Sequence, residues 1–316
     1  MPAVEDLLVS IGRVIGKPPG WERVVRAVAP PGRFHGGDLR PLTMPEGYVF
    51  PVDRGTLIGW SVHFFGTYEP EVQAEIRRWL RPGDVAVDVG ANVGWHTLLM
   101  GARVGPAGRV YTFEPNDSTR ARLVGAVEAN RFAHVIVDPR AVADRCRVAG
   151  FEAPAAGHVW DGTGHLLGQA ERAGSACGHA EATTGSSEPK HQRQLALGEG
   201  PQRQCKEVEC LTLDAFVAER GIDRLSLLKI DVEGWELPVL RGARQVLKSL
   251  RPAIVFEVDP GYVSRGGGTA ADLMAGFADA DYLVFSLHPR RAAARVMEPG
   301  GRAGNFLALP REKAAG

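Results

Sequence analysis

The chain has 316 residues, of which 44% are hydrophobic and 23% are charged, and its 37 basic side chains balance 37 acidic ones. These values are typical of a globular protein, and the 39 glycines and 22 prolines follow no collagen-like period, which excludes a fibre and bulk disorder. A net charge of zero gives no overall field that would favour nucleic acid or an anionic membrane, so we expect neither as a partner. The length predicts one elaborated domain or a domain with an added cap.

The sequence predicts a soluble, cytoplasmic protein. Its first residues include Glu5 and Asp6 and no apolar run of the signal-peptide kind, and nowhere do enough apolar residues follow one another to span a membrane. The four cysteines lie between Cys146 and Cys210 and are too few for a disulfide scaffold in so long a chain, so we expect reduced thiols. The sequence leaves the oligomeric state open.

Residues 1–80 are expected to form an N-terminal cap. After a helical start, a short extended section is expected, because two apolar stretches, 48–52 and 57–60, flank the turn-forming residues Asp53-Arg-Gly55. Apolar residues at helical spacing then predict a helix over 71–80, which the Arg-Pro-Gly sequence at 81–83 ends.

From residue 84, short and almost wholly apolar runs alternate with helical segments, a pattern typical of a parallel sheet covered on both faces. No helical pattern separates the last two runs, so we expect them to pair as an antiparallel hairpin at one edge. The seven expected strands are 85–89, 109–113, 134–137, 225–230, 253–258, 282–287 and 305–309. The expected helices are 95–104, 118–130, 212–220 and 236–249.

Residues 146–208 break this pattern. Between Trp160 and Val208 there is no Val, Ile, Phe or Tyr, so too little apolar area can be buried to offset the entropy of ordering. We therefore expect a mobile insertion that acts as a lid. Cysteine and histidine are suitable zinc ligands, but no Cys-x-x-Cys pair occurs and Cys205 and Cys210 match zinc-site spacing only loosely, so we expect no metal site.

The strongest local signal is Asp88-Val-Gly-Ala-Asn-Val-Gly94, in which a buried strand runs into a glycine turn and then a helix. Glycines let the backbone bend and approach a ligand, and free N–H groups lie at the start of the helix, so the segment predicts a cofactor cradle. The dinucleotide fingerprint is G-x-G-x-x-G, whereas Asn92 stands at the second glycine position, where it would keep a pyrophosphate away. An NAD-dependent oxidoreductase is therefore the less favoured alternative.

Two carboxylates stand at the ends of expected strands. Glu114 ends the second strand, about 20 positions after the glycine turn, where an acidic residue can accept both hydroxyls of a ribose. Asp231 ends the fourth strand, across the point where the order of the strands reverses.

Five segments, each at a strand end, follow one another in the order of a known family. They are Asp88-Val-Gly-Ala-Asn-Val-Gly94, Phe113-Glu-Pro-Asn116, Leu211-Thr-Leu-Asp214, Lys229-Ile-Asp-Val-Glu-Gly-Trp-Glu236 and Asn305-Phe-Leu-Ala-Leu309. Together they resemble the FkbM family of S-adenosylmethionine-dependent methyltransferases. The resemblance implies a Rossmann-like class I methyltransferase fold over 81–316, S-adenosylmethionine as cofactor, and O-methylation of a small-molecule hydroxyl on a sugar or secondary metabolite.

The parts of S-adenosylmethionine match residues at these strand ends. Glu114 suits the ribose diol because an ionised carboxylate accepts two hydroxyl hydrogen bonds, and Asp231 would face the methionine amine or the acceptor. Asp88 would order the turn or hold the ammonium through water, and the turn itself would lie beside the amino-acid portion. The predicted cofactor-binding residues are Asp88, Gly90, Ala91, Asn92, Glu114, Asn116 beside the adenine, Val142 in its apolar wall, and Asp231.

A hydroxyl acceptor benefits from a base that removes its proton as the new bond forms. Asp231 and then Glu233 are the first candidates, as the carboxylates nearest the expected methyl position, and His96 and His158 are the available histidines. Plainer roles stay open, since Glu233 would also suit the first turn of a helix and His96 would also suit packing. The alternative function is a non-catalytic cofactor-binding module on the same fold.

Overall fold

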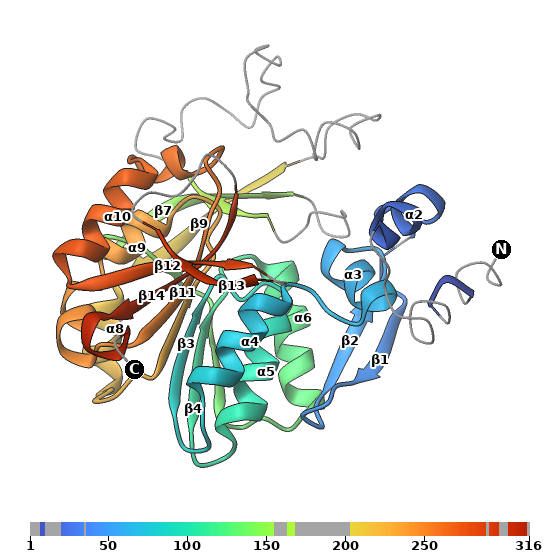
Figure 1. Cartoon of the computed structure of the whole chain (residues 1–316), viewed down its shortest axis with the longest axis horizontal. Coiled ribbons are helices and arrows are strands. Elements are labelled where there is room, and N and C mark those ends of the chain that lie inside the picture. Colours follow the sequence, from blue (N-terminus) through green and yellow to red (C-terminus); the bar gives the residue numbers. More distant parts are fainter. Residues whose placement is uncertain are drawn as a thin grey trace, which may run out of the picture.

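A computed structural model describes residues 7–9, 20–34, 36–154, 163–167, 203–288, 291–296 and 303–314. Within these residues, eight strands form one central sheet in the spatial order β13-β12-β14-β11-β10-β3-β4-β5 (Figure 1). They are β3 (Val85–Val89), β4 (Arg109–Phe113), β5 (Val135–Asp138), β10 (Leu227–Ile230), β11 (Ala253–Val258), β12 (Tyr282–His288), β13 (Arg291–Arg295) and β14 (Gly304–Pro310).

The sheet is parallel except toward one edge. β3 pairs in parallel with β4 on one side and with β10 on the other, and β5 and β11 extend the parallel part in both directions. β14 lies between β11 and β12 and is antiparallel to both. The predicted fold class and the antiparallel pairing of the last two predicted strands are thus confirmed, and β13, antiparallel to β12, is a strand that the sequence did not predict.

Helices cover both faces of this sheet, and β3 shows why. Val85, Val87 and Val89 belong to a core shared with α8, α9 and α10, whereas Ala86 belongs to a core shared with α4, α5 and α6. Successive side chains of a strand point to opposite faces, so a strand that is apolar throughout is buried on both. The helices are α4 (Pro70–Trp79), α5 (Trp95–Val104), α6 (Asp117–Ala129), α8 (Leu213–Arg220), α9 (Glu236–Arg241) and α10 (Ala270–Asp279), with the shorter η2 (Val246–Leu250), η3 (Val263–Gly266) and α11 (Arg311–Ala314).

Three helices differ from the sequence prediction. Residues 57–60, expected to be extended, begin helix α3 (Leu57–Phe65), which Thr56 caps by accepting the N–H of Gly59. The helix expected over 236–249 is divided into α9 and η2. Helix α10 was not predicted, although its capping box, in which Thr269 and Asp272 satisfy each other's backbone N–H groups, is a sequence signal for a helix start.

The N-terminal segment packs beside α6 (Figure 1). It contains α2 (Trp21–Val28), the antiparallel pair β1 (Leu39–Thr43) and β2 (Val49–Asp53), and α3 (Leu57–Phe65). Trp60 joins α3 to the end of α2 by donating its indole N–H to the carbonyl oxygen of Ala29 at 2.7 Å. The Asn130 side chain joins β2 to the end of α6 by two hydrogen bonds with the backbone of Val49, both of 2.7 Å.

A second sheet has the order β6-β9-β7-β8 and corrects the picture of a wholly mobile insertion. Both borders of the 146–208 segment are strands, and they pair antiparallel from Arg147 with Cys210 to Pro154 with Arg203. Val208 and Cys210 are buried and alternate with exposed residues, which is typical of a strand with one buried face. The apolar-poor middle of the segment drew attention away from this short alternation at its border. Residues 155–162 and 168–202 lie outside the described residues. The strands are β6 (Ala141–Val142), β7 (Arg147–Pro154), β8 (His165–Leu166) and β9 (Arg203–Leu211).

Of the cysteines that the structure describes, Cys146 and Cys205 are exposed and Cys210 is buried. Among the described residues, no helix combines the length and the apolar character needed to cross a membrane.

Candidate active site

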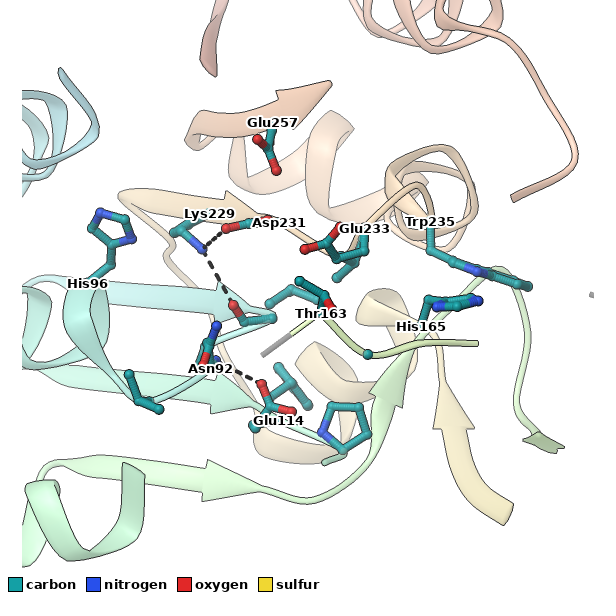
Figure 2. Close-up of a pocket in the computed structure, with 18 of the residues that line it drawn as sticks. Asn92, His96, Glu114, Thr163, His165, Lys229, Asp231, Glu233, Trp235 and Glu257 are labelled. Atoms are coloured by element: carbon teal, nitrogen blue, oxygen red, sulfur yellow. Dashed lines mark hydrogen bonds and ion pairs between the residues drawn. The ribbon is translucent and has the colours of Figure 1, made fainter. Parts of the chain in front are cut away.

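A cavity of about 430 Å³ lies at the carboxyl ends of the central strands (Figure 2). Its lining residues end or follow β3, β4, β10 and β11, at the point where the chain order of the strands reverses. Ligands of open α/β sheets bind at such a switch point. Residues of β7 and β8 and of the segment before α4 also line the cavity.

The predicted cofactor turn joins β3 to α5. Gly90 has φ +81°, and a Cβ there would lie 1.8 Å from the carbonyl oxygen of Asp231, so the site requires glycine. The N–H groups of Gly90 and Ala91 both donate to the carbonyl oxygen of Phe113, each at 3.1 Å. Asn92 also has a positive φ, of 53°. The turn is thus held between the ends of β4 and β10, and the N–H groups of its first two residues are used within the protein.

Glu114 fixes the next residue of the turn from the end of β4. Its Oε2 accepts the N–H of Asn92 at 2.7 Å and its Oε1 accepts the N–H of Asn116 at 2.8 Å. Burial raises the pKa of this carboxyl to about 7, and the two N–H donors oppose that rise. A carboxylate offers about four acceptor positions, so Glu114 keeps acceptor capacity for a ligand with two hydroxyls.

Lys229 is the buried cation of the site. Its Nζ lies 3.1 Å from Asp231 Oδ2 and 3.4 Å from Asp88 Oδ1, and it donates to the carbonyl oxygen of Gly90 at 3.5 Å. Thr97 donates a further hydrogen bond of 2.6 Å to Asp88, which is fully buried. Burial lowers the pKa of Lys229, but the charges of Asp231 and Asp88 outweigh burial and raise it above its usual value, so the ammonium stays protonated.

Three further carboxyls line the cavity near Asp231, and they come from separate parts of the chain. Glu69 precedes α4, Glu233 follows β10 and Glu257 lies in β11. Burial, and then the charge of Asp231, raises the pKa of Glu69 and of Glu233 to about 8, although Lys229 opposes the rise at Glu69. The same two causes hold the pKa of Glu257 well above its usual value.

Glu233 is held in an unusual backbone conformation. Its φ is 55°, a left-handed value that costs free energy for any residue with a side chain and that clusters at functional sites. Arg265 donates a hydrogen bond of 3.3 Å to its carbonyl oxygen. Among the described residues, its carboxylate makes no hydrogen bond or ion pair, so this side chain is available to a ligand.

His96 lines the cavity from the first turn of α5. The ring is 5% exposed, and within the described residues its Nε2 has no hydrogen-bond partner. The nearest carboxylate oxygen is Glu69 Oε2, at 3.7 Å. Burial, and then the charge of Lys229, holds the pKa of His96 well below its usual value, so the imidazole is neutral at pH 7.

One wall of the cavity is apolar and aromatic. Val142 and Phe151 contribute to it from the second sheet, and Trp235 lies beside His165 (Figure 2). Within the part of the chain that the structure describes, no three His, Cys, Asp or Glu residues are arranged to hold a metal ion.

The structure brings together most of the residues that the sequence singled out. Asp88 lies behind the cavity in its contact with Lys229, and Asn116 caps α6 by accepting the N–H of Ser118 at 3.1 Å, so neither is a lining residue. His158 lies outside the described residues. The predicted residues that line the cavity are Gly90, Ala91, Asn92, Glu114, Val142, Asp231, Glu233 and His96.

Sequence reasoning missed several functional candidates. Lys229 begins one of the five family-like segments of the sequence. Its role becomes visible only from the parallel register of β10 and β3, which places it beside Asp88. Glu69 and Glu257 lie far apart in the chain and outside the five family-like segments, so nothing in the sequence indicates that they share a site. Tyr68, another lining residue, has a pKa raised well above its usual value, first by the charge of Glu69.

A family comparison bears on this site directly. The family described as "Methyltransferase FkbM domain" matches residues 88–284, which are more than half of the chain and include the glycine turn, Glu114, Lys229, Asp231 and Glu233. This chain belongs to the FkbM methyltransferase family. Membership confirms the predicted enzyme class, a methyltransferase whose methyl donor is S-adenosylmethionine.

Individual relatives are more distant. The chain is 30% identical over 204 residues to the "AMB antimetabolite synthetase AmbE" of Pseudomonas aeruginosa; the match covers 60% of this chain and 9% of that protein, so the chain spans only a small part of this relative's length.

The comparison with solved structures finds methyltransferases of low sequence identity. An O-methyltransferase from Thermotoga maritima is 12% identical over 92% of this chain and 80% of its own, with a TM-score of 0.36. An rRNA methylase from Streptococcus thermophilus is 8% identical over 76% and 93%, with a TM-score of 0.37. An O-methyltransferase from Bacillus cereus is 11% identical over 77% and 82%, with a TM-score of 0.36.

Proposed function

We propose that this FkbM-family protein transfers a methyl group from S-adenosylmethionine to a hydroxyl of a small molecule. The observation that carries the proposal is the division of the cavity into two ends. Glu114 and Asn92 lie at one end, and the carboxylates of Asp231, Glu233 and Glu257 lie toward the other (Figure 2). The first end suits a cofactor, and the second suits an acceptor that must lose a proton.

The residues at the cofactor end fit S-adenosylmethionine. The remaining acceptor capacity of Glu114 suits a ribose diol, and the absence of a side chain at Gly90 lets the ligand approach the backbone. Val142 would pack against the adenine, and Asp231 would attract the ammonium of the methionine portion. Asp88 acts indirectly, because it holds Lys229, which in turn orients Asp231.

The bound cofactor supplies an electrophilic methyl group, so the chain's own part is to align the acceptor and to remove its proton. We assign the proton to Glu233 rather than to Asp231, the first candidate from the sequence. Asp231 Oδ2 is engaged by Lys229 at 3.1 Å, whereas the Glu233 carboxylate is free among the described residues. A pKa of about 8 makes Glu233 a stronger base, once ionised, than an ordinary carboxylate. Glu233 would take the hydroxyl proton as the methyl–sulfur bond of the cofactor breaks and the methyl group passes to the acceptor oxygen.

A small acceptor is supported by the size of the cavity. Its volume of about 430 Å³ lies within the range of small-molecule pockets, and the zero net charge offers no field for nucleic acid. The name of the Pseudomonas relative, an antimetabolite synthetase, also concerns a small molecule.

Two measurements test the proposal. Calorimetry should show binding of S-adenosylhomocysteine but not of NAD, and isotope-labelled S-adenosylmethionine should label a hydroxylated acceptor. Glu233→Gln should lower kcat by about 10²–10⁴-fold while leaving the Kd for S-adenosylhomocysteine unchanged. Glu209→Gln, on an exposed position of β9, is the matched control.

The outcomes separate the alternatives. Absence of S-adenosylhomocysteine binding would contradict the function, and a wild-type kcat in Glu233→Gln would contradict the role of that carboxyl. Binding without transfer to any hydroxyl would favour the non-catalytic module.

A further inference from the structure

Acidic side chains outnumber basic ones at the acceptor end of the cavity. Asp231, Glu233, Glu257 and Glu69 all contribute carboxyls to the lining, and they are supplied by β10, the loop after it, β11 and the segment before α4. Because four separate elements bring them to one cavity, the excess is a property of the folded site and not of one acidic stretch of sequence.

The cations of the site do not balance these carboxyls. Lys229 is already shared between Asp88 and Asp231, so its single positive charge faces two carboxylates. Arg265 donates to the backbone carbonyl of Glu233 and stacks over the ring of Tyr262, 3.8 Å from its centroid, rather than bonding a carboxylate. The methionine ammonium of the cofactor would compensate Asp231 but not the others.

The carboxyls also lack partners of the kind that neutralise buried acids. Glu257, like Glu233, makes no side-chain hydrogen bond or ion pair among the described residues. Their raised pKa values, which burial and neighbouring carboxylates cause, show that ionisation of the whole group is unfavourable without a ligand. A bound cation would reverse this, since an opposite charge favours the ionised form.

A second, independent feature points to a ligand at the same place. His96 is 5% exposed and lines the cavity, and its Nε2 has no hydrogen-bond partner among the described residues. A buried polar atom without a partner costs free energy unless a ligand or water satisfies it. The rings of Tyr68, Trp235 and Tyr262 also line the cavity, and aromatic faces attract organic cations.

We infer that the acceptor is a hydroxyl compound that carries a permanently charged or readily protonated amine, and that Glu257 and Glu69 recognise this cation, which leaves Glu233 to take the hydroxyl proton. The inference rests on the proposed function and names the substrate class of the same site. The amine would lie between Glu257 and Glu69, and its hydroxyl would reach past Glu233 toward the cofactor end. A neutral sugar would leave the carboxyls either protonated or mutually repelling, so it fits the site less well.

Other charged and titratable groups of the cavity set the pH dependence of such binding. Glu69 and Glu233 ionise as the pH rises through about 8 in the ligand-free protein, so a cation should bind more tightly with rising pH and release protons as it binds. The titratable and charged groups that face Glu69, Glu233 and Glu257 are Asp231, Lys229, His96, Tyr68, Glu71, Glu236, Asp259 and Arg265.

Choline and its uncharged analogue 3,3-dimethyl-1-butanol provide a matched pair of probes, because they share their shape and hydroxyl and differ in charge. Their Kd values are measured by calorimetry on the full chain saturated with S-adenosylhomocysteine, which keeps both probes out of the cofactor end. Choline should bind at least about tenfold more tightly than the analogue. Its affinity should rise between about pH 6 and about pH 9, with proton release that differs between buffers.

Variants locate the effect. Glu257→Gln should reduce the preference for choline several-fold without changing the Kd for S-adenosylhomocysteine, and the exposed Glu209→Gln should leave the preference intact. Equal binding of the two probes, including no binding of either, would overturn the inference, as would an undiminished preference in Glu257→Gln. Failure of S-adenosylhomocysteine to bind would instead contradict the proposed function, so the two failures are distinguishable.

Discussion

The ammonium of Lys229 lies 3.1 Å from the carboxylate of Asp231, and the two residues stand two positions apart at the end of β10. The parallel register of β10 and β3 places Lys229 beside Asp88 as well. One buried cation therefore connects the strand that precedes the glycine turn with the carboxylate on the opposite side of the switch point.

Removal of that cation should destabilise the fold. In Lys229→Met, the fully buried Asp88 loses its compensating charge, and breaking a buried ion pair by removing one partner costs about 3–5 kcal/mol. Urea unfolding of Lys229→Met and of the exposed Lys248→Met should show this loss only in the first variant. Adding Asp88→Asn to Lys229→Met should restore part of the stability, and equal stability of Lys229→Met and wild type would refute the role of the ion pair.

The glycine turn should tolerate no side chain at its first glycine. Gly90→Ala places a Cβ 1.8 Å from the carbonyl oxygen of Asp231, whereas Gly83, with a similar φ of +91°, has no atom within 4 Å of the added Cβ. Gly83→Ala therefore measures the cost of the left-handed backbone alone, about 1–2 kcal/mol. We expect Gly90→Ala to lose at least about 2 kcal/mol more in thermal or urea unfolding; equal losses would show that β10 can move away from the turn.

Glu114→Gln should weaken cofactor binding. An amide has one acceptor oxygen, so it cannot accept from the N–H groups of Asn92 and Asn116 and still bind a diol as the carboxylate does. Loss of hydrogen bonds to a charged group, worth about 1.5–3 kcal/mol, corresponds to a Kd for S-adenosylhomocysteine that is about 10–100-fold higher. Calorimetry with the exposed Glu128→Gln as control checks this. The affinity of the wild type should also fall as the pH drops through about 7, where Glu114 becomes protonated, and the variant should lack that step.

The stability of the ligand-free protein should fall as the pH rises. The folded pKa values of Glu69 and Glu233 are about 8, above the ordinary carboxyl value of 4.5 that holds when the chain is unfolded. Between these two values the folded state binds more protons than the unfolded state, so the free energy of unfolding decreases with increasing pH. Urea unfolding from about pH 5 to about pH 8 should show this slope, and Glu257→Gln should reduce it by removing one of the repelling charges. A rising slope over this range would contradict the charge assignment.

Local patterns were sufficient to predict seven of the eight described strands of the central sheet. Its strands are buried on both faces and are therefore apolar almost throughout, so runs such as Val85–Val89 are visible without knowledge of their neighbours. The glycine turn was equally visible, because the positive φ of Gly90 and the closeness of Asp231 leave no other residue type for that position.

The acceptor end could not be predicted in the same way. Glu69 and Glu257 have no shared motif, and only the packing of α4 against the sheet brings them to one cavity. The pairing of β7 with β9 joins segments that a long apolar-poor stretch separates, so the composition of that stretch predicted a mobile insertion and gave no sign of the pairing at its borders. Long-range pairing of this kind leaves little trace in a local window of sequence.

The register of β7 and β9 has an evolutionary consequence. Pro154 lies opposite Arg203, so the end of β7 and the start of β9 are adjacent, and the excursion between them returns to the sheet only as the two-residue β8 within its described residues. The entropy of closing such an excursion grows only with the logarithm of its length, which makes insertions and deletions between the two strands inexpensive for the fold. Thr163 and His165, which line the cavity, belong to this excursion. Replacing this one excursion would therefore change the acceptor end of the cavity while leaving the cofactor cradle on β3 and β4 in place.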